Sequence, residues 1–203
     1  MSKRKWTRRG ALIAGAGGAA AACTPSVETP PYEGAVAFSH GVASGDPRQD
    51  RVVIWTRVSP ERGGDVPVRW IVARNRELTD IVKTGVIAAT EARDYTVKAD
   101  VAGLRPGAPY FYGFRAGAAE SAVGRTRTLP RGSVETARIG VVSCASFPYG
   151  FFNAYESLAR RDDIDLVIHL GDYIYEYGIS GYGGDVGLQL GRVPAPEVEC
   201  LSL

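Results

Sequence analysis

Three side chains in the second half of the chain have the chemistry of metal ligands. Cys144 ends the apolar run VVSC, Asp172 follows the run LVIHLG, and Tyr175 lies three residues later. Thiolate, carboxylate and phenolate groups are all anionic when they bind a metal, so without a cation they would repel one another. A metal ion removes this repulsion by coordinating the deprotonated forms. Two hard oxygen donors with one thiolate fit ferric iron better than zinc, and they argue against a pure Ca²⁺ or Mg²⁺ site.

The same residues also have a simpler interpretation. Cys144 can be a buried, small apolar side chain, Asp172 can cap a turn, and the nearby tyrosines can be interfacial. A Cys144–Cys200 disulfide is a further alternative in an oxidising compartment, although three cysteines do not make a disulfide framework. The two histidines, His40 and His169, are predicted to be structural rather than metal ligands, because neither lies in a ligand motif.

A strand–helix–strand unit is predicted to position the candidate ligands. Residues 138–143 and 164–170 are continuous apolar strands, and residues 150–161, GFFNAYESLARR, have apolar side chains close to a helical period. Strands that do not alternate are typical of a βαβ unit, in which both strands are parallel and covered on both faces.

The predicted strand direction places the candidate ligands together. Ligands bind beyond the carboxyl ends of parallel strands, which is where Cys144 and Asp172 lie. A turn after the second strand would bring the Tyr175 phenol beside the Asp172 carboxylate. From residue 179 onward the sequence predicts a Gly-rich loop.

Residues 36–130 have a different pattern, typical of an immunoglobulin- or fibronectin-like β-sandwich. About seven short strands are expected between turn signals, and the clearest are residues 51–58, 66–73, 94–101 and 110–116. Residues 104–114, LRPGAPYFYGF, place Tyr110, Tyr112 and Phe114 on one strand face. This segment is similar to a tyrosine corner, although plain core aromatics would give the same fold.

The first 23 residues are interpreted as an export signal, with a basic start and a short Ala- and Gly-rich stretch. Arg8 and Arg9 in TRRGALI resemble a twin-arginine signal, which would make the twin-arginine export machinery a partner. Cys23 ends AAAC, a loose lipobox, so cleavage and lipid anchoring both remain open. Residues 24–35 are expected to be a Pro-rich linker. The predicted location is periplasmic, extracellular or anchored to the cell envelope.

The charge distribution does not indicate a nucleic-acid partner. The formal net charge is +2, from 24 basic and 22 acidic residues. Five of the basic residues lie before residue 10, so the remainder has 19 basic and 22 acidic residues, a net charge of −3. The only membrane contact expected is through the signal or a lipid anchor.

Several motifs together resemble the alkaline phosphatase D (PhoD-like) family of the calcineurin-like metallophosphoesterases. They are VVSCAS, GFFNAYESLA and DLVIHLGDYIYEYG, and FSHGVASGDPRQDRVVIWTRV resembles the family's N-terminal sandwich. The resemblance covers residues 36–199. It implies a β-sandwich followed, at residues 138–203, by the start of an α/β metallophosphoesterase domain.

The resemblance also implies a function and its cofactors. Cys144, Asp172 and Tyr175 match iron ligands, and Asp172 matches a carboxylate that also bridges to a calcium position, so Fe³⁺ and Ca²⁺ are expected. The implied reaction is hydrolysis of small-molecule or lipid phosphate esters. The rim of the cleft is expected to consist of Tyr173, Glu176 and Tyr177.

The sequence departs from the family pattern near its end. Pro194 stands where the family has His, and the family's later Asn and Trp-Asp-Asp-His-Glu motifs are not in these 203 residues. The chain therefore resembles the N-terminal part of such an enzyme, and we expect it to be inactive by itself. The alternative function is an exported β-sandwich that acts only as a binding or structural module.

Overall fold

The computed structural model describes residues 32–201. Its helices are α1 (Asn153–Ala159), α2 (Gly184–Leu190) and a 3₁₀ helix (Glu91–Arg93). Its strands are β1 (Val36–Ala37), β2 (Val42–Gly45), β3 (Arg51–Arg57), β4 (Ser59–Pro60), β5 (Val66–Ala73), β6 (Ile81–Ala89), β7 (Thr96–Ala102), β8 (Pro109–Ala116), β9 (Ala119–Glu120), β10 (Gly124–Arg127), β11 (Ile139–Val142) and β12 (Leu166–His169).

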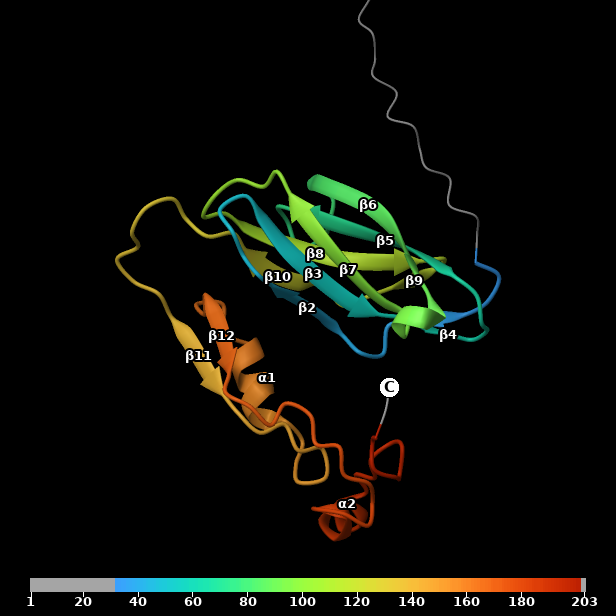
Figure 1. Cartoon of the computed structure of the whole chain (residues 1–203). Helices are drawn as coiled ribbons and strands as arrows, with labels where there is room; N and C mark the ends of the chain where they lie inside the picture. Colours follow the sequence, from blue (N-terminus) through green and yellow to red (C-terminus); the bar gives the residue numbers. More distant parts are fainter. Residues whose placement is uncertain (1–31, 202–203) are drawn as a thin grey trace, which may run out of the picture. The chain divides into compact units, whose positions relative to one another are not determined.

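Two antiparallel sheets pack face to face (Figure 1). One has the order β2-β3-β7 and the other β10-β8-β5-β6 with β9 paired to β8, while β4 pairs with β1 in a separate two-stranded sheet. Burial alternates along β3, where Val52, Ile54 and Thr56 point inward. β7 alternates in the same way. Because successive strand residues face opposite sides, this pattern places one face of each strand in a shared apolar core. The predicted β-sandwich is confirmed.

The aromatic strand of the sandwich makes a tyrosine corner. Tyr110, Tyr112 and Phe114 are all buried on the inner face of β8. The Tyr110 hydroxyl accepts a hydrogen bond of 2.9 Å from the backbone N–H of Arg105, five residues upstream. A tyrosine that bonds back to the preceding chain is the feature that defines such a corner in sandwich domains. This hydrogen bond therefore fixes the position of the segment that leads into β8.

The second module contains the predicted βαβ unit. β11 and β12 are parallel, with Gly140 paired with Val167 and Val142 paired with His169. A Cβ atom on Gly140 would lie 2.8 Å from a methyl carbon of Leu158 in α1, so the helix packs closely against this glycine. Strand alternation then places Val142, Val167 and His169 on the helix-covered face.

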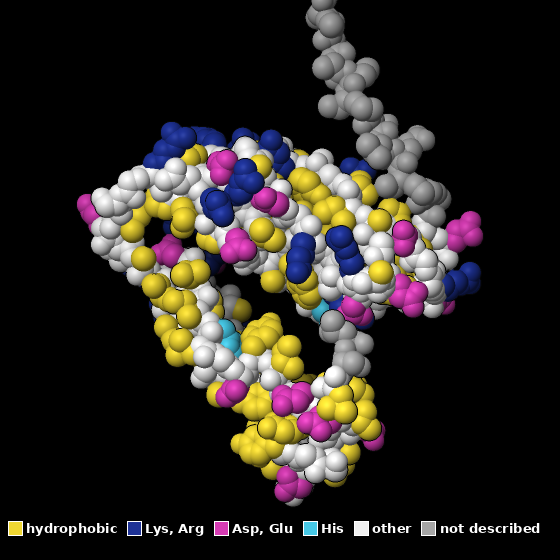
Figure 2. All heavy atoms as spheres, viewed as in Figure 1, with side chains coloured by type: hydrophobic (Ala, Val, Ile, Leu, Met, Phe, Trp, Pro, Cys, Tyr) yellow, Lys and Arg dark blue, Asp and Glu magenta, His cyan; other side chains and the backbone are white. Residues whose placement is uncertain are grey.

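The opposite face of this small sheet is open, which corrects the expectation that both faces are covered. Its apolar side chains are exposed by 40% to 70%, and they are Ile139, Val141, Leu166, Ile168 and Leu170. Figure 2 shows hydrophobic side chains gathered over this module. Within residues 32–201 α1 packs on the Gly140 face, and Val167 on that face is itself 50% exposed, so neither face is fully covered.

The helices of the second module also differ from the sequence expectation. α1 begins at Asn153, so Phe151 and Phe152 precede the helix instead of lying in it, and Phe152 has a left-handed backbone with φ 58°. The segment after residue 179, predicted as a loop, contains α2. Both differences trace to contacts that join segments distant in sequence, described below.

Candidate metal centre

The turns after β11 and β12 bring Cys144 and Asp172 together. The Cys144 N–H donates to the carbonyl of Gly171 at 3.0 Å, and the Ala145 N–H donates to the carbonyl of Asp172 at 2.8 Å. These bonds continue the parallel pairing past the ends of both strands. The Cys144 Sγ lies 3.5 Å from Asp172 Oδ2. The structure thus places the thiol and the carboxylate in direct contact.

Both residues have an unusual backbone conformation. Cys144 has φ 62° and Asp172 has φ 53°, and Gly171 between strand and turn has φ 136°. Residues other than glycine rarely adopt positive φ, and each such residue costs about 1–3 kcal/mol. The two left-handed residues interrupt the extended backbone that follows each strand, at the point where the side chains meet. Strain of this kind is concentrated at functional sites.

Tyr175 joins the same cluster. Its side chain lines the same cavity as Cys144. The neighbouring Cys144 thiol, removal from water and the negative charge of Asp172 together raise the pKa of the Tyr175 phenol above its usual value. Its ring stacks on Tyr182, with ring centroids 6.5 Å apart and an angle of 17° between planes. Of the sequence-predicted ligands, the structure therefore brings all three, Cys144, Asp172 and Tyr175, to one place.

A cavity of about 670 Å³ opens beside Cys144 and Tyr175. Its wall is mostly aromatic and includes Tyr149, Phe151, Phe152, Tyr155 and Tyr182, together with Ser146, Gly150, Asn153 and Ala154. The Ser146 hydroxyl oxygen is buried and has no hydrogen-bond partner among the described residues. A cavity of this size is in the range of small-molecule sites.

Tyr173, Glu176 and Tyr177, which are expected at the rim of the cleft, do not line this cavity. Tyr173 packs edge-on against His169, and Tyr177 lies behind Tyr182 with ring centroids 5.9 Å apart. Sequence analysis missed Tyr149 and Tyr182, because they lie in loop segments without a motif. The excess of aromatic residues in those loops was the only available signal.

Arg192 holds the aromatic loop that lines the cavity. Its guanidinium carbon lies 3.9 Å from the ring centre of Phe147, 4.8 Å from that of Phe151 and 5.3 Å from that of Phe152. Its Nε also donates to the carbonyl of Phe147 at 2.7 Å. A cation above an aromatic face is attracted by the ring quadrupole. These contacts explain why Phe151 and Phe152 leave the helical pattern.

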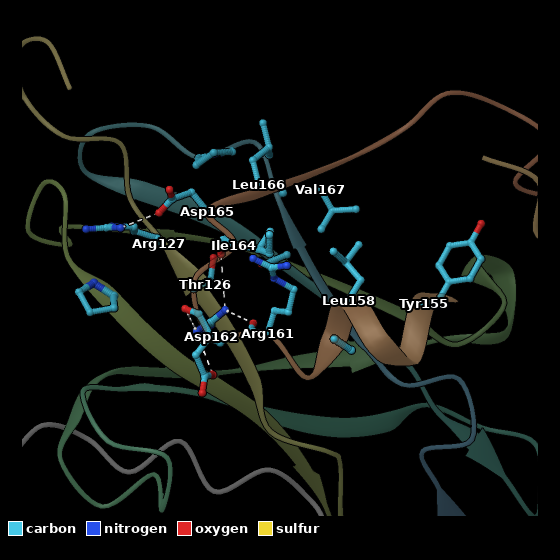
Figure 3. A pocket seen from close by; sticks show the side chains of 16 residues that line it. Thr126, Arg127, Tyr155, Leu158, Arg161, Asp162, Ile164, Asp165, Leu166 and Val167 are labelled. Atoms are coloured by element: carbon cyan, nitrogen blue, oxygen red, sulfur yellow. Dashed lines mark hydrogen bonds and ion pairs between the residues drawn. The ribbon is translucent and has the colours of Figure 1, made fainter. Parts of the chain in front are cut away.

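A second cavity, of about 610 Å³, contains none of the three candidate ligands (Figure 3). Its charged side chains are paired with each other. Arg127 donates to Asp165 Oδ1 at 2.8 Å, and Arg125 donates to both the carbonyl and the carboxylate of Asp162. We assign this cavity to the packing of β10 against the segment between α1 and β12, because its polar groups already have partners.

The donor set fits a metal ion. Within residues 32–201 no three His, Cys, Asp or Glu side chains gather, and the third candidate beside Cys144 and Asp172 is the Tyr175 phenol. The Cys144 thiol and the Asp172 carboxylate raise the pKa of Tyr175, as expected where acidic groups meet without a cation. A cation at this point would favour all three anionic forms at once. Three donors also leave coordination positions free, as catalytic metal sites require.

The other sequence candidates lie elsewhere. Cys144 and Cys200 are both free thiols, so the alternative disulfide is absent from the described structure. His40 lies 3.5 Å from Arg57 in the sandwich. Arg8, Arg9 and Cys23 are outside the described residues. Within residues 32–201 we find no helix with both the length and the apolar character needed to cross a membrane.

Comparison with known proteins gives matches over nearly the whole described chain. Residues 22–130 match the family model of the PhoD-like phosphatase N-terminal domain, and residues 139–203 match the model of the PhoD-like phosphatase itself. Alkaline phosphatase D of Bacillus subtilis (strain 168) is 40% identical over 159 residues, which are 74% of this chain and 27% of that protein.

A solved structure of PhoD aligns with a TM-score of 0.66 and 38% identity, over 74% of this chain and 30% of that one. The chain thus spans less than a third of the length of these relatives. The matched segments carry both the sandwich and the Cys144–Asp172 unit. The chain belongs to the PhoD-like phosphatase family.

Proposed function

We propose that the protein carrying this chain hydrolyses phosphate esters at a metal centre that Cys144, Asp172 and Tyr175 help to hold. The observation that carries the proposal is the 3.5 Å contact between Cys144 Sγ and Asp172 Oδ2, at the carboxyl ends of two parallel strands. Family membership supports the reaction class, and the anionic donor set supports the metal.

Each of the three residues has a distinct role in this proposal. Cys144 supplies the soft thiolate donor, and Tyr175 supplies a hard phenolate. Asp172 has one carboxylate oxygen near the thiol and a second that can reach a neighbouring ion, so it suits a bridging position. We propose Fe³⁺ at the position nearest Cys144 and Ca²⁺ at the neighbouring one, in keeping with the resemblance of these motifs. A bound metal would supply Lewis-acid stabilisation of negative charge on the phosphate.

The aromatic cavity supports small-molecule or lipid phosphate esters as substrates. Tyr149, Phe151 and Tyr182 offer ring faces to the alcohol portion of an ester, while Cys144 and Tyr175 mark the end where phosphate would lie. Monoesters and diesters both fit this arrangement.

We also propose that the protein is exported through the signal at residues 1–23, with Arg8 and Arg9 as the twin-arginine pair. Cys23 is the candidate for lipid attachment. Export of a folded protein is consistent with loading of iron before transport.

The experiment that tests the function uses the full-length protein of the coding frame that contains these residues. The protein is freed of metal with a chelator and assayed with a chromogenic phosphomonoester and a chromogenic diester. We expect turnover to fall to the uncatalysed level and to return when Fe³⁺ and Ca²⁺ are added together. Zn²⁺ should not replace iron, because two of the three donors are hard oxygens.

Turnover that survives complete removal of metal would contradict the proposed centre. If the metal-loaded protein hydrolyses no ester, the alternative role of the chain as a binding or structural sandwich would replace the proposed function.

A further inference from the structure

A hydrogen-bonded chain links the backbone on both sides of the candidate metal centre. The Gly171 N–H donates to His169 Nδ1 at 3.3 Å. The Tyr155 hydroxyl lies 2.9 Å from His169 Nε2 and donates to the carbonyl of Ser143 at 3.2 Å. These hydrogen bonds therefore connect β12, through α1, to the end of β11.

The hydrogen-bond partners of His169 and Tyr155 determine which atoms of these two side chains carry protons. A backbone N–H can only donate, so His169 Nδ1 must be the acceptor, and a neutral imidazole then carries its proton on Nε2. That proton is donated to the Tyr155 oxygen, which leaves the Tyr155 proton for the Ser143 carbonyl. One arrangement of protons thus gives an acceptor to each of the three donors: the Gly171 N–H, the His169 Nε2–H and the Tyr155 O–H.

The two ends of this chain are the peptide groups next to the candidate ligands. Ser143 directly precedes Cys144, and Gly171 directly precedes Asp172. Both ligands have a positive φ, a conformation that persists only where surrounding contacts hold it. His169 and Tyr155 provide such contacts for both turns at once.

Packing keeps the two rings in place. The Tyr155 and His169 rings are nearly parallel, with 16° between planes and centroids 6.0 Å apart. Tyr173 packs edge-on against the other side of His169, at 5.0 Å. His169 lies on the helix-covered face of the sheet, opposite the exposed face. The imidazole is thus fixed by two rings and two hydrogen bonds.

We propose that His169 and Tyr155 are positioning residues that set the relative placement of Cys144 and Asp172. Neither side chain hydrogen-bonds to the thiol or the carboxylate, and both act through the adjoining backbone. This inference rests on the proposed function for its effect on metal affinity, but its effect on the geometry of the turns does not. Residues that orient metal ligands change metal affinity by about 10- to 100-fold when they are replaced.

The test compares four variants of the full chain, all in a background with Cys23→Ser and Cys200→Ser, so that Cys144 is the reporting thiol among the three cysteines of this sequence. Tyr155→Phe removes the hydroxyl and keeps the ring. His169→Phe removes both nitrogens, whereas His169→Asn keeps an oxygen near the Nδ1 position to accept from Gly171. Tyr173→Phe is the matched control, because its exposed ring stays and its hydroxyl is not part of the chain.

Two readouts are measured, with thermal unfolding as the check on folding. The first is Fe³⁺ affinity in competition with citrate, where Tyr155→Phe and His169→Phe should bind about 10- to 100-fold more weakly and His169→Asn should be intermediate. The second is the rate of Cys144 modification by a disulfide reagent in metal-free protein. It should change several-fold in His169→Phe and Tyr155→Phe, and remain unchanged in Tyr173→Phe.

The two readouts separate this inference from the proposed function. If the unsubstituted protein binds no Fe³⁺, the proposed metal centre fails, and the modification rate alone decides on the positioning role. An unchanged modification rate in both Tyr155→Phe and His169→Phe would overturn the inference, whatever the metal affinity. Equal effects in His169→Asn and His169→Phe would show that the Gly171 bond contributes nothing.

Discussion

Replacement of Asp172 by alanine is expected to lower kcat/KM for phosphate ester hydrolysis by the full-length protein by at least about 1,000-fold. The carboxylate contacts Cys144 and is the only one of the three donors with two oxygens for metal. Its removal would forfeit several kcal/mol of charge stabilisation in the transition state, and each 1.36 kcal/mol is a factor of ten in rate.

The control for this prediction is Asp65→Ala, which removes an exposed carboxylate from the sandwich. It should leave kcat/KM within about twofold of the parent value, since exposed substitutions rarely change the structure. An Asp172→Ala enzyme that keeps more than a tenth of the parent activity would place the catalytic metal elsewhere.

The second large effect is expected in the visible absorption of the iron-loaded protein. Ferric iron bound to the Tyr175 phenolate should give a visible charge-transfer band, and Tyr175→Phe should abolish it because a phenyl ring has no donor oxygen. Tyr177→Phe, two residues away in the same loop, should keep the band. A visible band of unchanged intensity in Tyr175→Phe would show that another group supplies the phenolate.

The sequence predicted the parallel strands and the meeting of Cys144 with Asp172 well, for a physical reason. Continuous apolar runs are typical of strands in parallel sheets, and the carboxyl ends of such strands converge. The sequence alone therefore predicts that the Cys144 and Asp172 side chains lie close together. The pairing needed only strand direction, which the intervening helical pattern supplies.

Elements that contain glycine were missed because tertiary contacts override local propensity. α2 contains the buried Gly184 and Gly187, and glycine disfavours a helix interior. A Cβ on Gly184 would overlap the carbonyl of Ile179, so close packing requires glycine there. β6 is not among the clearest strands predicted from the sequence, and it also contains a glycine. Gly85 lies under the Trp70 ring, where a Cβ would be 2.6 Å from the nearest ring carbon.

The aromatic cavity could not be predicted, because its wall depends on contacts between loops. Phe151 and Phe152 continue a helical period in the sequence, yet Arg192, about 40 residues later, packs against both rings. Tyr182 reaches Tyr149 and Tyr175 from a Gly-rich segment. No local sequence pattern predicts contacts between side chains of loops that are distant in sequence.

The central claim is that Cys144 and its two partners bind a metal, and X-ray absorption at the iron edge tests it most directly. Iron-loaded protein should show a sulfur neighbour near 2.3 Å, the usual metal–thiolate distance. Cys144→Ser should lose that sulfur, and Cys200→Ser, which removes the other free thiol of the described chain, should keep it. A sulfur neighbour that persists in Cys144→Ser, or its absence from the unsubstituted protein, would contradict the proposed centre.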